Sequence, residues 1–364
     1  MNKFRFLFSS DDYGSAEQNY FFIKKNKYID KKNSIILSNE ITKKIYKKTG
    51  IKKQFLIRSK EKKLSRKILE NIKKKKINFF IVGLNSKNFS IDKKILDLSK
   101  KLNIQSGCIQ DYWGNYGFFT KKNSPNFFWV LDLESRRFVK TKLSEKTKIL
   151  ITGSPKYDFG KYLINKKKYN IKKKKIKIII ISQPLNILGI KNFYKDCVDF
   201  LNKIEKKIKI YLLEHPEDDQ SIKYIRQNLN FFNFKILKKK KIQKLKENNM
   251  VISISCFSTM TYDMIFNDLT SNNQSLNIFY QNLNFKKNLK KKLIGLKKMP
   301  LIDEKIAIVL SSKAKIEKII SSKNFFLDLS TYQKKNSSKY FKKMKNSSMK
   351  ITKSIVKDNN KLTL

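Results

Sequence analysis

Histidine, proline and glycine are scarce in this chain. Its 364 residues contain one histidine, five prolines and ten glycines. The three cysteines, Cys108, Cys197 and Cys256, lie far apart and form no Cys-x-x-Cys pair. This spacing argues against a structural zinc site and against a disulfide framework. We therefore expect no disulfides and a reducing compartment, the cytoplasm.

Long hydrophobic runs are also missing. The longest apolar run, residues 176–182 (IKIIIIS), has the length of a strand and is far shorter than the roughly 20 residues of a membrane-spanning helix. The first residues, MNKFRFLFSSDDYG, contain too short an apolar stretch for a signal peptide. We therefore expect a cytoplasmic protein whose contact with a membrane is at most peripheral, at its inner face.

Acidic residues are few beside the basic ones: 29 against 83, which gives a formal net charge of +54. Such a charge points to nucleic acid or an anionic membrane surface. However, Lys, Asn and Ile are all abundant, as in proteins of AT-rich genomes, and the lysines are spread along the whole chain. Arginine is scarce beside lysine, and no helix-turn-helix, zinc module or RNP-like motif is present, which argues against specific nucleic-acid binding. Peripheral contact with an anionic membrane remains an expectation.

The chain does contain enough hydrophobic residues, 40% in all, to build packed cores. Short apolar runs alternate with amphipathic, lysine-faced helical patterns such as residues 39–50 and 91–103. Strands are predicted at residues 4–10, 34–38, 54–59, 78–86, 105–111, 127–132 and 148–155. The second half repeats the scheme, with strands at 176–182 and 208–216 around a helix at 192–207, and further segments at 221–229, 233–237, 242–248, 249–255, 258–266 and 276–280. Strand–helix alternation predicts an α/β fold with parallel sheets.

The length favours two domains, and a lysine-rich break without apolar periodicity supplies the boundary. We predict a Rossmann-like domain at residues 1–164, a linker at 165–175, a second Rossmann-like domain at 176–312, and closing helices with a polar tail at 313–364. Two such domains are expected to face a cleft, with ligands beyond the carboxyl ends of the parallel strands.

The one histidine, His215, stands where such a ligand is expected. It follows a predicted strand and precedes Pro216, which fixes the loop. A lone histidine is usually structural, but an imidazole at this position can donate a hydrogen bond to a phosphate oxygen. The sequence therefore makes His215 a candidate phosphate ligand.

A hydroxyl cluster follows another strand of the second half. Ser255, Ser258 and Thr259 lie between a predicted strand and a predicted helix that begins near Thr259. Hydroxyls and free backbone N–H groups at a helix N-terminus form an anion site. An ordinary Ser/Thr N-cap is the alternative, although it accounts for one hydroxyl and not for the cluster.

Two acidic corners stand out in the first half. Asp111 follows a strand beside Tyr112 and Trp113, where burial would raise the pKa of its carboxyl and suit it to be a general base. An Asx-turn in an aromatic loop is the alternative. In SSDDYGSAEQ, the residues Asp12, Gly14 and Ser15 either line the acceptor side or form a helix cap.

Taken in order, these residues resemble the GT-B glycosyltransferases and, more narrowly, the bacterial sialyltransferase and polysialyltransferase-like families. HP is present at His215–Pro216, and CFST matches a Ser/Thr motif at Ser258 and Thr259. The segment SQPL, with Gln183, resembles the opening of the second domain in one such family. TGSPKYD, with Gly153 and Ser154, is similar to a G-x-P-x-x-D turn of several GT-B families, including CDP-glycerol polymerases and epimerase-like enzymes. QDYWGNY departs from the family's acid–acid–glycine motif, because it has Gln-Asp and a late glycine.

The resemblance implies a glycosyltransferase that moves a sugar, of sialic-acid type in the narrower families, from a nucleotide-sugar to a glycan or glycolipid acceptor at the cell surface. His215, Ser258 and Thr259 would bind the donor phosphate, and Asp111 would deprotonate the acceptor hydroxyl. The other residues expected at the nucleotide site are Pro216, Ser255, Gln183, Gly153 and Ser154. No cofactor is implied, and a metal-independent reaction is expected, because the nearest D-x-D-like segment, LDLES with Asp132 and Glu134, reads as a strand end. A glycerophosphate transferase or sugar-nucleotide epimerase of the same fold is the first alternative. A basic nucleic-acid-binding protein is the alternative from another class.

Overall fold

The computed structural model describes residues 3–57, 64–84, 90–113, 115–158, 175–183, 185, 190, 192–204, 208–215, 218–229, 234–247, 249–269, 274–282 and 299–362. The chain divides into two compact units. The first comprises Met1–Phe159 and Lys343–Leu364, and the second comprises Gly160–Lys342. Apart from Lys175, the predicted linker lies outside the described residues. The last helix is thus part of the first unit, whereas the sequence predicted a separate closing segment from residue 313.

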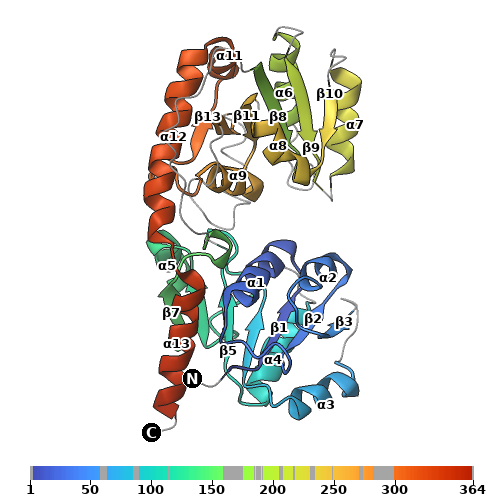
Figure 1. Cartoon of the computed structure of the whole chain (residues 1–364), viewed down its shortest axis with the longest axis vertical. Helices are drawn as coiled ribbons and strands as arrows, with labels where there is room; N and C mark the ends of the chain where they lie inside the picture. Colours follow the sequence, from blue (N-terminus) through green and yellow to red (C-terminus); the bar gives the residue numbers. More distant parts are fainter. Residues whose placement is uncertain are drawn as a thin grey trace. The chain divides into compact units, whose positions relative to one another are not determined.

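The first unit is a parallel sheet with strand order β3-β2-β1-β4-β5-β6-β7 (Figure 1). Its elements are β1 (Phe6–Ser10), α1 (Tyr13–Lys25), β2 (Ile35–Ser38), α2 (Glu40–Tyr46), β3 (Lys53–Leu56), α3 (Arg66–Lys74), β4 (Phe79–Val82), α4 (Ile91–Lys101), β5 (Ser106–Ile109), β6 (Phe127–Val130), α5 (Leu133–Lys140), β7 (Lys148–Ile151), the 3-10 turn η1 (Pro155–Tyr157) and α13 (Ser347–Leu362). All seven strands predicted in this half are confirmed.

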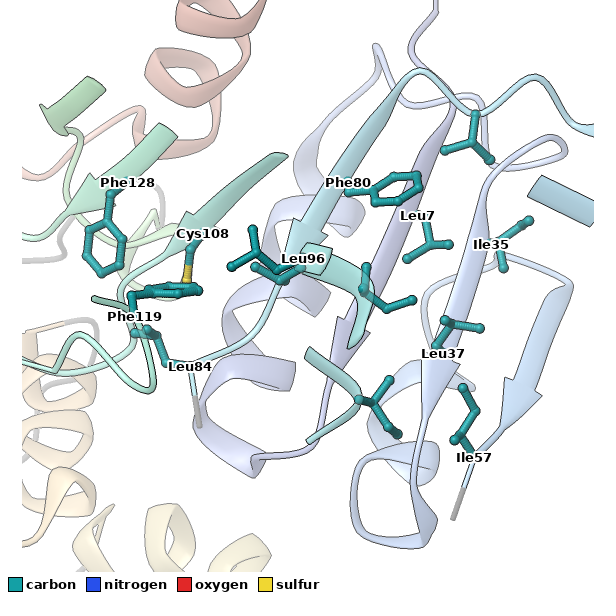
Figure 2. Packing of buried hydrophobic residues seen from close by; sticks show 14 of the residues in the cluster. Leu7, Ile35, Leu37, Ile57, Phe80, Leu84, Leu96, Cys108, Phe119 and Phe128 are labelled. Atoms are coloured by element: carbon teal, nitrogen blue, oxygen red, sulfur yellow. The ribbon is translucent and has the colours of Figure 1, made fainter. Parts of the chain in front are cut away.

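Both faces of this sheet are buried, because successive side chains of a strand point to opposite faces. In β1, Leu7 packs into one core cluster while Phe6 and Phe8 pack into the other. Residues of α3, α4 and α5 cover the Leu7 face, part of which Figure 2 shows around Phe80, Leu96 and Cys108. Residues of α1, α2 and α13 cover the Phe6 face. Each fully buried Leu, Ile or Phe stabilises the fold by roughly 1.5–3 kcal/mol.

Helix α13 docks on the first unit through contacts that span most of the chain. The carboxylate of Asp158 accepts hydrogen bonds from the backbone N–H groups of Ser347 and Ser348, both at 2.8 Å, and so caps the helix. The indole Nε1 of Trp129 donates to Ser354 Oγ at 2.9 Å. Residues 347–362 of the predicted closing segment therefore form a helix that is held by residues 189 or more positions away.

The second unit is also a parallel sheet, with strand order β10-β9-β8-β11-β12-β13 (Figure 1). Its elements are β8 (Lys175–Ile181), α6 (Phe193–Asn202), β9 (Lys209–Leu213), α7 (Asp219–Asn228), β10 (Phe234–Leu237), η3 (Lys239–Lys241), α8 (Ile242–Glu247), β11 (Asn249–Ser255), α9 (Thr259–Leu269), β12 (Gln274–Tyr280), β13 (Ile308–Leu310), α11 (Lys313–Ser321) and α12 (Lys323–Lys343). The segments predicted at 176–182, 208–216, 233–237, 249–255 and 276–280 form β8 to β12, and those at 192–207, 221–229, 242–248 and 258–266 form α6 to α9. The short β13 was missed, because three partly buried residues carry little periodic signal.

Candidate functional site

The first unit gathers polar residues at the carboxyl ends of β1, β4 and β5, which are neighbours in the sheet. Asp12 begins α1 directly after β1, Gly83 follows β4, and Asp111 follows β5. Parallel strands end at one edge, and the helices that follow begin there, so loops distant in sequence meet. Asp12, Gly14, Ser15 and Asp111, proposed separately from sequence, are brought together here.

Asp111 is held by two polar side chains. Its Oδ1 accepts a hydrogen bond from Asn115 Nδ2 at 2.8 Å, and its Oδ2 lies 3.3 Å from the hydroxyl of Ser15. Burial, followed by the nearby charge of Asp12, raises the pKa of Asp111 to about 7. The residue nevertheless keeps a partly exposed edge. The expected rise in pKa is present, and protein packing is its largest cause.

Asp12 forms the helix cap that was one of the two alternatives for its loop, and its place on the acceptor side stays a prediction. Its carboxylate caps α1 by accepting from the N–H groups of Gly14, at 2.8 Å, and Ser15, at 3.4 Å. The same side chain is exposed and acts electrostatically on Asp111. It is therefore both a helix cap and a neighbour of the candidate base.

A fully buried acid, Asp92, was not found from the sequence. Its carboxylate accepts hydrogen bonds from Ser9 Oγ at 2.6 Å, Gly83 N at 2.9 Å and Asp11 N at 3.0 Å. The Asp11 carboxylate in turn accepts a hydrogen bond from the backbone N–H of Ile91 at 2.6 Å. Burial, followed by the charge of Asp11, raises the pKa of Asp92 to about 6. Together these contacts fix the loop that carries Asp12.

In the second unit, polar residues follow the adjacent strands β9, β8 and β11. The backbone N–H of His215, after β9, donates to Ser182 Oγ at 3.3 Å. Gln183 follows Ser182 in the chain, and its side-chain oxygen accepts hydrogen bonds from the N–H groups of Cys256 and Phe257, each at 3.1 Å. The segment after β8 therefore ties together the loop of His215 and the loop that leads to α9. The Gln183 side chain thus holds the loop that leads to α9 against the segment after β8.

Asp218 braces the same loops from inside. It is buried, and its Oδ2 accepts from the hydroxyls of Ser182 at 2.6 Å and Tyr194 at 2.9 Å. The tyrosine hydroxyl in turn accepts from Gln183 N at 2.7 Å. The sequence offered only one cue to this role, the position of Asp218 three residues after His215.

The N-terminus of α9 keeps free donors. Ser258 Oγ accepts from Met260 N at 3.2 Å, so Ser258 is the helix cap that the sequence allowed as an alternative. Among the described residues, the N–H groups of Ser258 and Thr259 have no hydrogen-bond acceptor. Unpaired N–H groups at a helix N-terminus attract anions. Ser255 differs, because it is fully buried and its hydroxyl bonds Thr261 at 2.7 Å.

Gly153 and Ser154 are packed inside the first unit. Gly153 has φ +80°, and a Cβ there would lie 2.7 Å from Ser347 Oγ. Ser154 is buried, and its hydroxyl donates to Gln18 Oε1 at 2.8 Å. The G-x-P-x-x-D turn thus seats α13, with Asp158 as its cap. Pro216, the remaining predicted ligand, lies outside the described residues.

Metal-binding clusters and membrane-spanning helices are absent from the described residues. These residues contain no group of three or more His, Cys, Asp or Glu side chains able to hold a metal ion. Asp132 instead caps α5 by accepting from Ser135 N at 2.8 Å, and it accepts from Trp113 Nε1 at the same distance. The three cysteines are buried and free. Within the described part of the chain, no helix has the length and hydropathy needed to cross a membrane.

Comparison with known proteins supports the fold. No family model and no curated protein matches the sequence. The UDP-GlcNAc 2-epimerase from Neisseria meningitidis, solved with UDP-GlcNAc, is 12% identical with a TM-score of 0.62, over 98% of this chain and 100% of that chain. S. aureus MnaA, solved with UDP, is 10% identical with a TM-score of 0.62, over 99% of this chain and 97% of that chain. The spinosyn rhamnosyltransferase SpnG is 9% identical with a TM-score of 0.54, over 96% of this chain and 99% of that chain.

These similarities show the architecture that GT-B glycosyltransferases and UDP-GlcNAc 2-epimerases have in common: two parallel-sheet α/β domains. The fold class predicted from sequence is confirmed. The narrower resemblance to sialyltransferases stays a prediction.

Proposed function

We propose that this protein is a nucleotide-sugar-dependent glycosyltransferase. In this proposal the acid cluster of the first unit activates the acceptor hydroxyl, and the loops after β9 and β11 bind the donor phosphate. The observation that carries the proposal is Asp111, a carboxyl group with a pKa raised to about 7 and a partly exposed edge. A general base is most effective when its pKa is close to the working pH.

The chemistry assigns one task to each set of residues. Asp111 accepts the proton of the acceptor hydroxyl while that oxygen forms a bond to the anomeric carbon of the donor sugar. The bond between this carbon and the phosphate oxygen breaks, and the nucleotide leaves with the bonding electrons. A general base contributes roughly 10²–10⁴-fold to such a rate.

Residues of the second unit stabilise the negative charge that develops on the leaving phosphate. The N–H groups of Ser258 and Thr259, the Thr259 hydroxyl and the imidazole of His215 supply hydrogen-bond donors. Donors that are already fixed in place stabilise developing charge at little cost of reorganisation. The bracing of both loops by Gln183 and Asp218 supports this role. No step requires a metal ion.

The HP and Ser/Thr motifs favour a sugar of sialic-acid type as the donor group, and a surface glycan or glycolipid as the acceptor. The lysine-rich composition supports peripheral contact with an anionic membrane that presents the acceptor. A glycerophosphate transferase also needs a base and a phosphate site, but its acceptor oxygen forms a bond to phosphorus, and the bond between the two donor phosphates breaks to release the nucleotide.

A sugar-nucleotide epimerase is the second candidate. The observation in its favour is the TM-score of 0.62 to the epimerase solved with UDP-GlcNAc, against 0.54 to the rhamnosyltransferase. An epimerase requires an acid or base at the sugar ring and no acceptor, so acceptor dependence separates the two reactions.

A two-stage experiment tests the proposal. Thermal shift is measured first with CMP-, UDP-, GDP- and CDP-linked compounds, and the stabilising donor is then incubated with and without glycan acceptors. Acceptor-dependent release of nucleotide supports a transferase. Conversion of the donor to an isomer of equal mass without acceptor establishes an epimerase. Stabilisation by none of these donors, together with tight binding to random nucleic acid at physiological salt, would refute both.

A further inference from the structure

Two carboxylates lie over the Cα of Gly14, the second residue of α1. A Cβ built on this glycine would lie 2.9 Å from Asp111 Oδ2 and 3.2 Å from Asp12 Oδ2. The two oxygens are therefore no more than about 6 Å apart, since each lies about 3 Å from the same point. Any side chain at position 14 would occupy the space that both oxygens face.

Backbone conformation does not explain the glycine. Gly14 has no positive φ, unlike Gly50, Gly117 and Gly153. Glycine within a helix is also about 1 kcal/mol less favourable than alanine. The requirement that remains is space beside the two carboxylates.

Asp12 is fixed in this position by its capping role. Its Oδ2 receives the N–H groups of Gly14 and Ser15, and its carbonyl oxygen accepts from Ser10 Oγ at 2.8 Å and Ala16 N at 3.0 Å. Donors at a helix N-terminus stabilise a negative charge. The charge of Asp12 is therefore held next to Asp111.

The other groups around Asp111 do not offset this charge. Asn115 and Ser15 are neutral hydrogen-bond donors to its two oxygens. The Cys108 thiol on β5 stays protonated, because burial raises its pKa. In the described part of the chain, no lysine or arginine forms an ion pair with Asp111. Asp12 is the nearby charge that acts most strongly on the candidate base.

We propose that Asp12 is a positioning residue that keeps Asp111 ready to accept a proton, and that Gly14 keeps open the space in which the acceptor hydroxyl lies. The proposal rests on the proposed function, in which Asp111 is the base. Asp12 Oδ2 and Asp111 Oδ2 then flank the hydroxyl, and its proton passes to Asp111.

The decisive variant is Asp12→Asn. Asparagine is as good an N-cap as aspartate, so α1 is retained while the charge is removed. Titration of Asp111 is followed by NMR of ¹³C-labelled aspartate carboxyls, with its signal assigned by its loss in Asp111→Asn. We expect the midpoint to fall by about one pH unit, the scale for a like charge some 6 Å away at a partly exposed site. It stays above that of an ordinary aspartate, because burial is the larger cause.

The control is Asp97→Asn, which removes the charge of an exposed acid on α4 and should leave the Asp111 midpoint unchanged. A midpoint equally unchanged in Asp12→Asn would show that Asp12 is only a cap, and would overturn the proposal. Where turnover is measurable, the acid limb of the pH–rate profile should move to lower pH together with the NMR midpoint.

Gly14→Ala tests whether the acceptor needs the space beside the carboxylates of Asp12 and Asp111. We expect unchanged donor affinity and thermal midpoint, with kcat/KM for the acceptor lowered by about a hundred-fold, the scale of a misplacement of about 1 Å. Unaltered acceptor kinetics would overturn the role of Gly14. The NMR titration needs no substrate, so it can fail while the glycosyltransferase assignment stands. Conversely, a donor screen without hits together with tight binding to random nucleic acid refutes the function and leaves the titration readable.

Discussion

The carboxyl edges of the two sheets have the same topology and opposite chemistry. At the edge of the first unit, Asp111 and Asp92 have raised pKa values, and Asp111 keeps an exposed side. At the edge of the second unit, the acid Asp218 is buried and holds hydroxyls, while the N–H groups of Ser258 and Thr259 have no acceptor among the described residues. In the proposed function, the first edge accepts a proton and the second binds an anion.

The difference shows how little of the chemistry the fold dictates. Both edges are built from a strand, a short loop and a helix N-terminus. In α1 the cap is Asp12, which places a negative charge at the edge, whereas in α9 the cap is Ser258, which leaves the helix N-terminus positive. Substitutions at these positions therefore test the comparison directly.

The largest effect is expected from Asp111→Asn. The amide keeps the shape of the side chain and loses the ability to accept a proton, so turnover should fall by about a hundred-fold or more. Donor affinity, which belongs to the other edge, should be unchanged. Steady-state kinetics and donor titration measure the two. A parallel loss of donor affinity would contradict this division of tasks.

A smaller effect is expected from His215→Ala, and it concerns donor binding rather than turnover. Loss of a charge-assisted hydrogen bond to the donor phosphate should weaken nucleotide binding by roughly ten- to a hundred-fold. Folding should be nearly unaffected, because His215 is partly exposed and its backbone contact to Ser182 remains. Calorimetric titration of the nucleotide checks this. His215→Asn should retain part of the contribution of the hydrogen bond, and His215→Phe should retain none of it. Wild-type affinity in His215→Ala would make the imidazole structural.

Ser258→Asp gives the second edge the cap chemistry of the first. Aspartate caps a helix as well as serine, so the thermal midpoint should stay within experimental error of wild type. The added negative charge should repel the donor phosphate and lower nucleotide affinity by about ten-fold or more. Ser258→Ala is the control, with stability lowered by about 1 kcal/mol. Should Ser258→Asp bind the nucleotide as tightly as wild type, the phosphate lies elsewhere.

The last effect concerns stability and pH. The pKa of Asp111 is about 7 in the folded protein against 3.8 for an ordinary aspartate, so the unfolded chain loses this proton first as pH rises. The contribution of Asp111 to stability therefore falls between about pH 4 and pH 7 and is constant above. The difference in unfolding free energy between Asp111→Asn and wild type should grow in favour of the variant across that window. Denaturant unfolding at several pH values measures it, and a difference independent of pH would show that Asp111 titrates normally.

The sequence by itself determined where most of the strands lie. Apolar runs predicted the strands because burial leaves a periodic record along one segment. Asp12, Asp111, His215 and Ser258 were identified as edge residues because they follow such runs. These inferences rest on neighbours within a few positions, which the sequence displays directly.

Only the tertiary structure decided which of these residues meet and what each does. Asp92 reads as an ordinary first-turn acid of an amphipathic helix, yet it bonds Ser9 and Asp11, more than 80 positions away. Gly153 and Ser154 pack within the first unit, and Asp158 caps a helix 189 positions later. The physical reason is that hydrogen bonding and burial depend on distance in space, whereas a single sequence records only what each element requires locally.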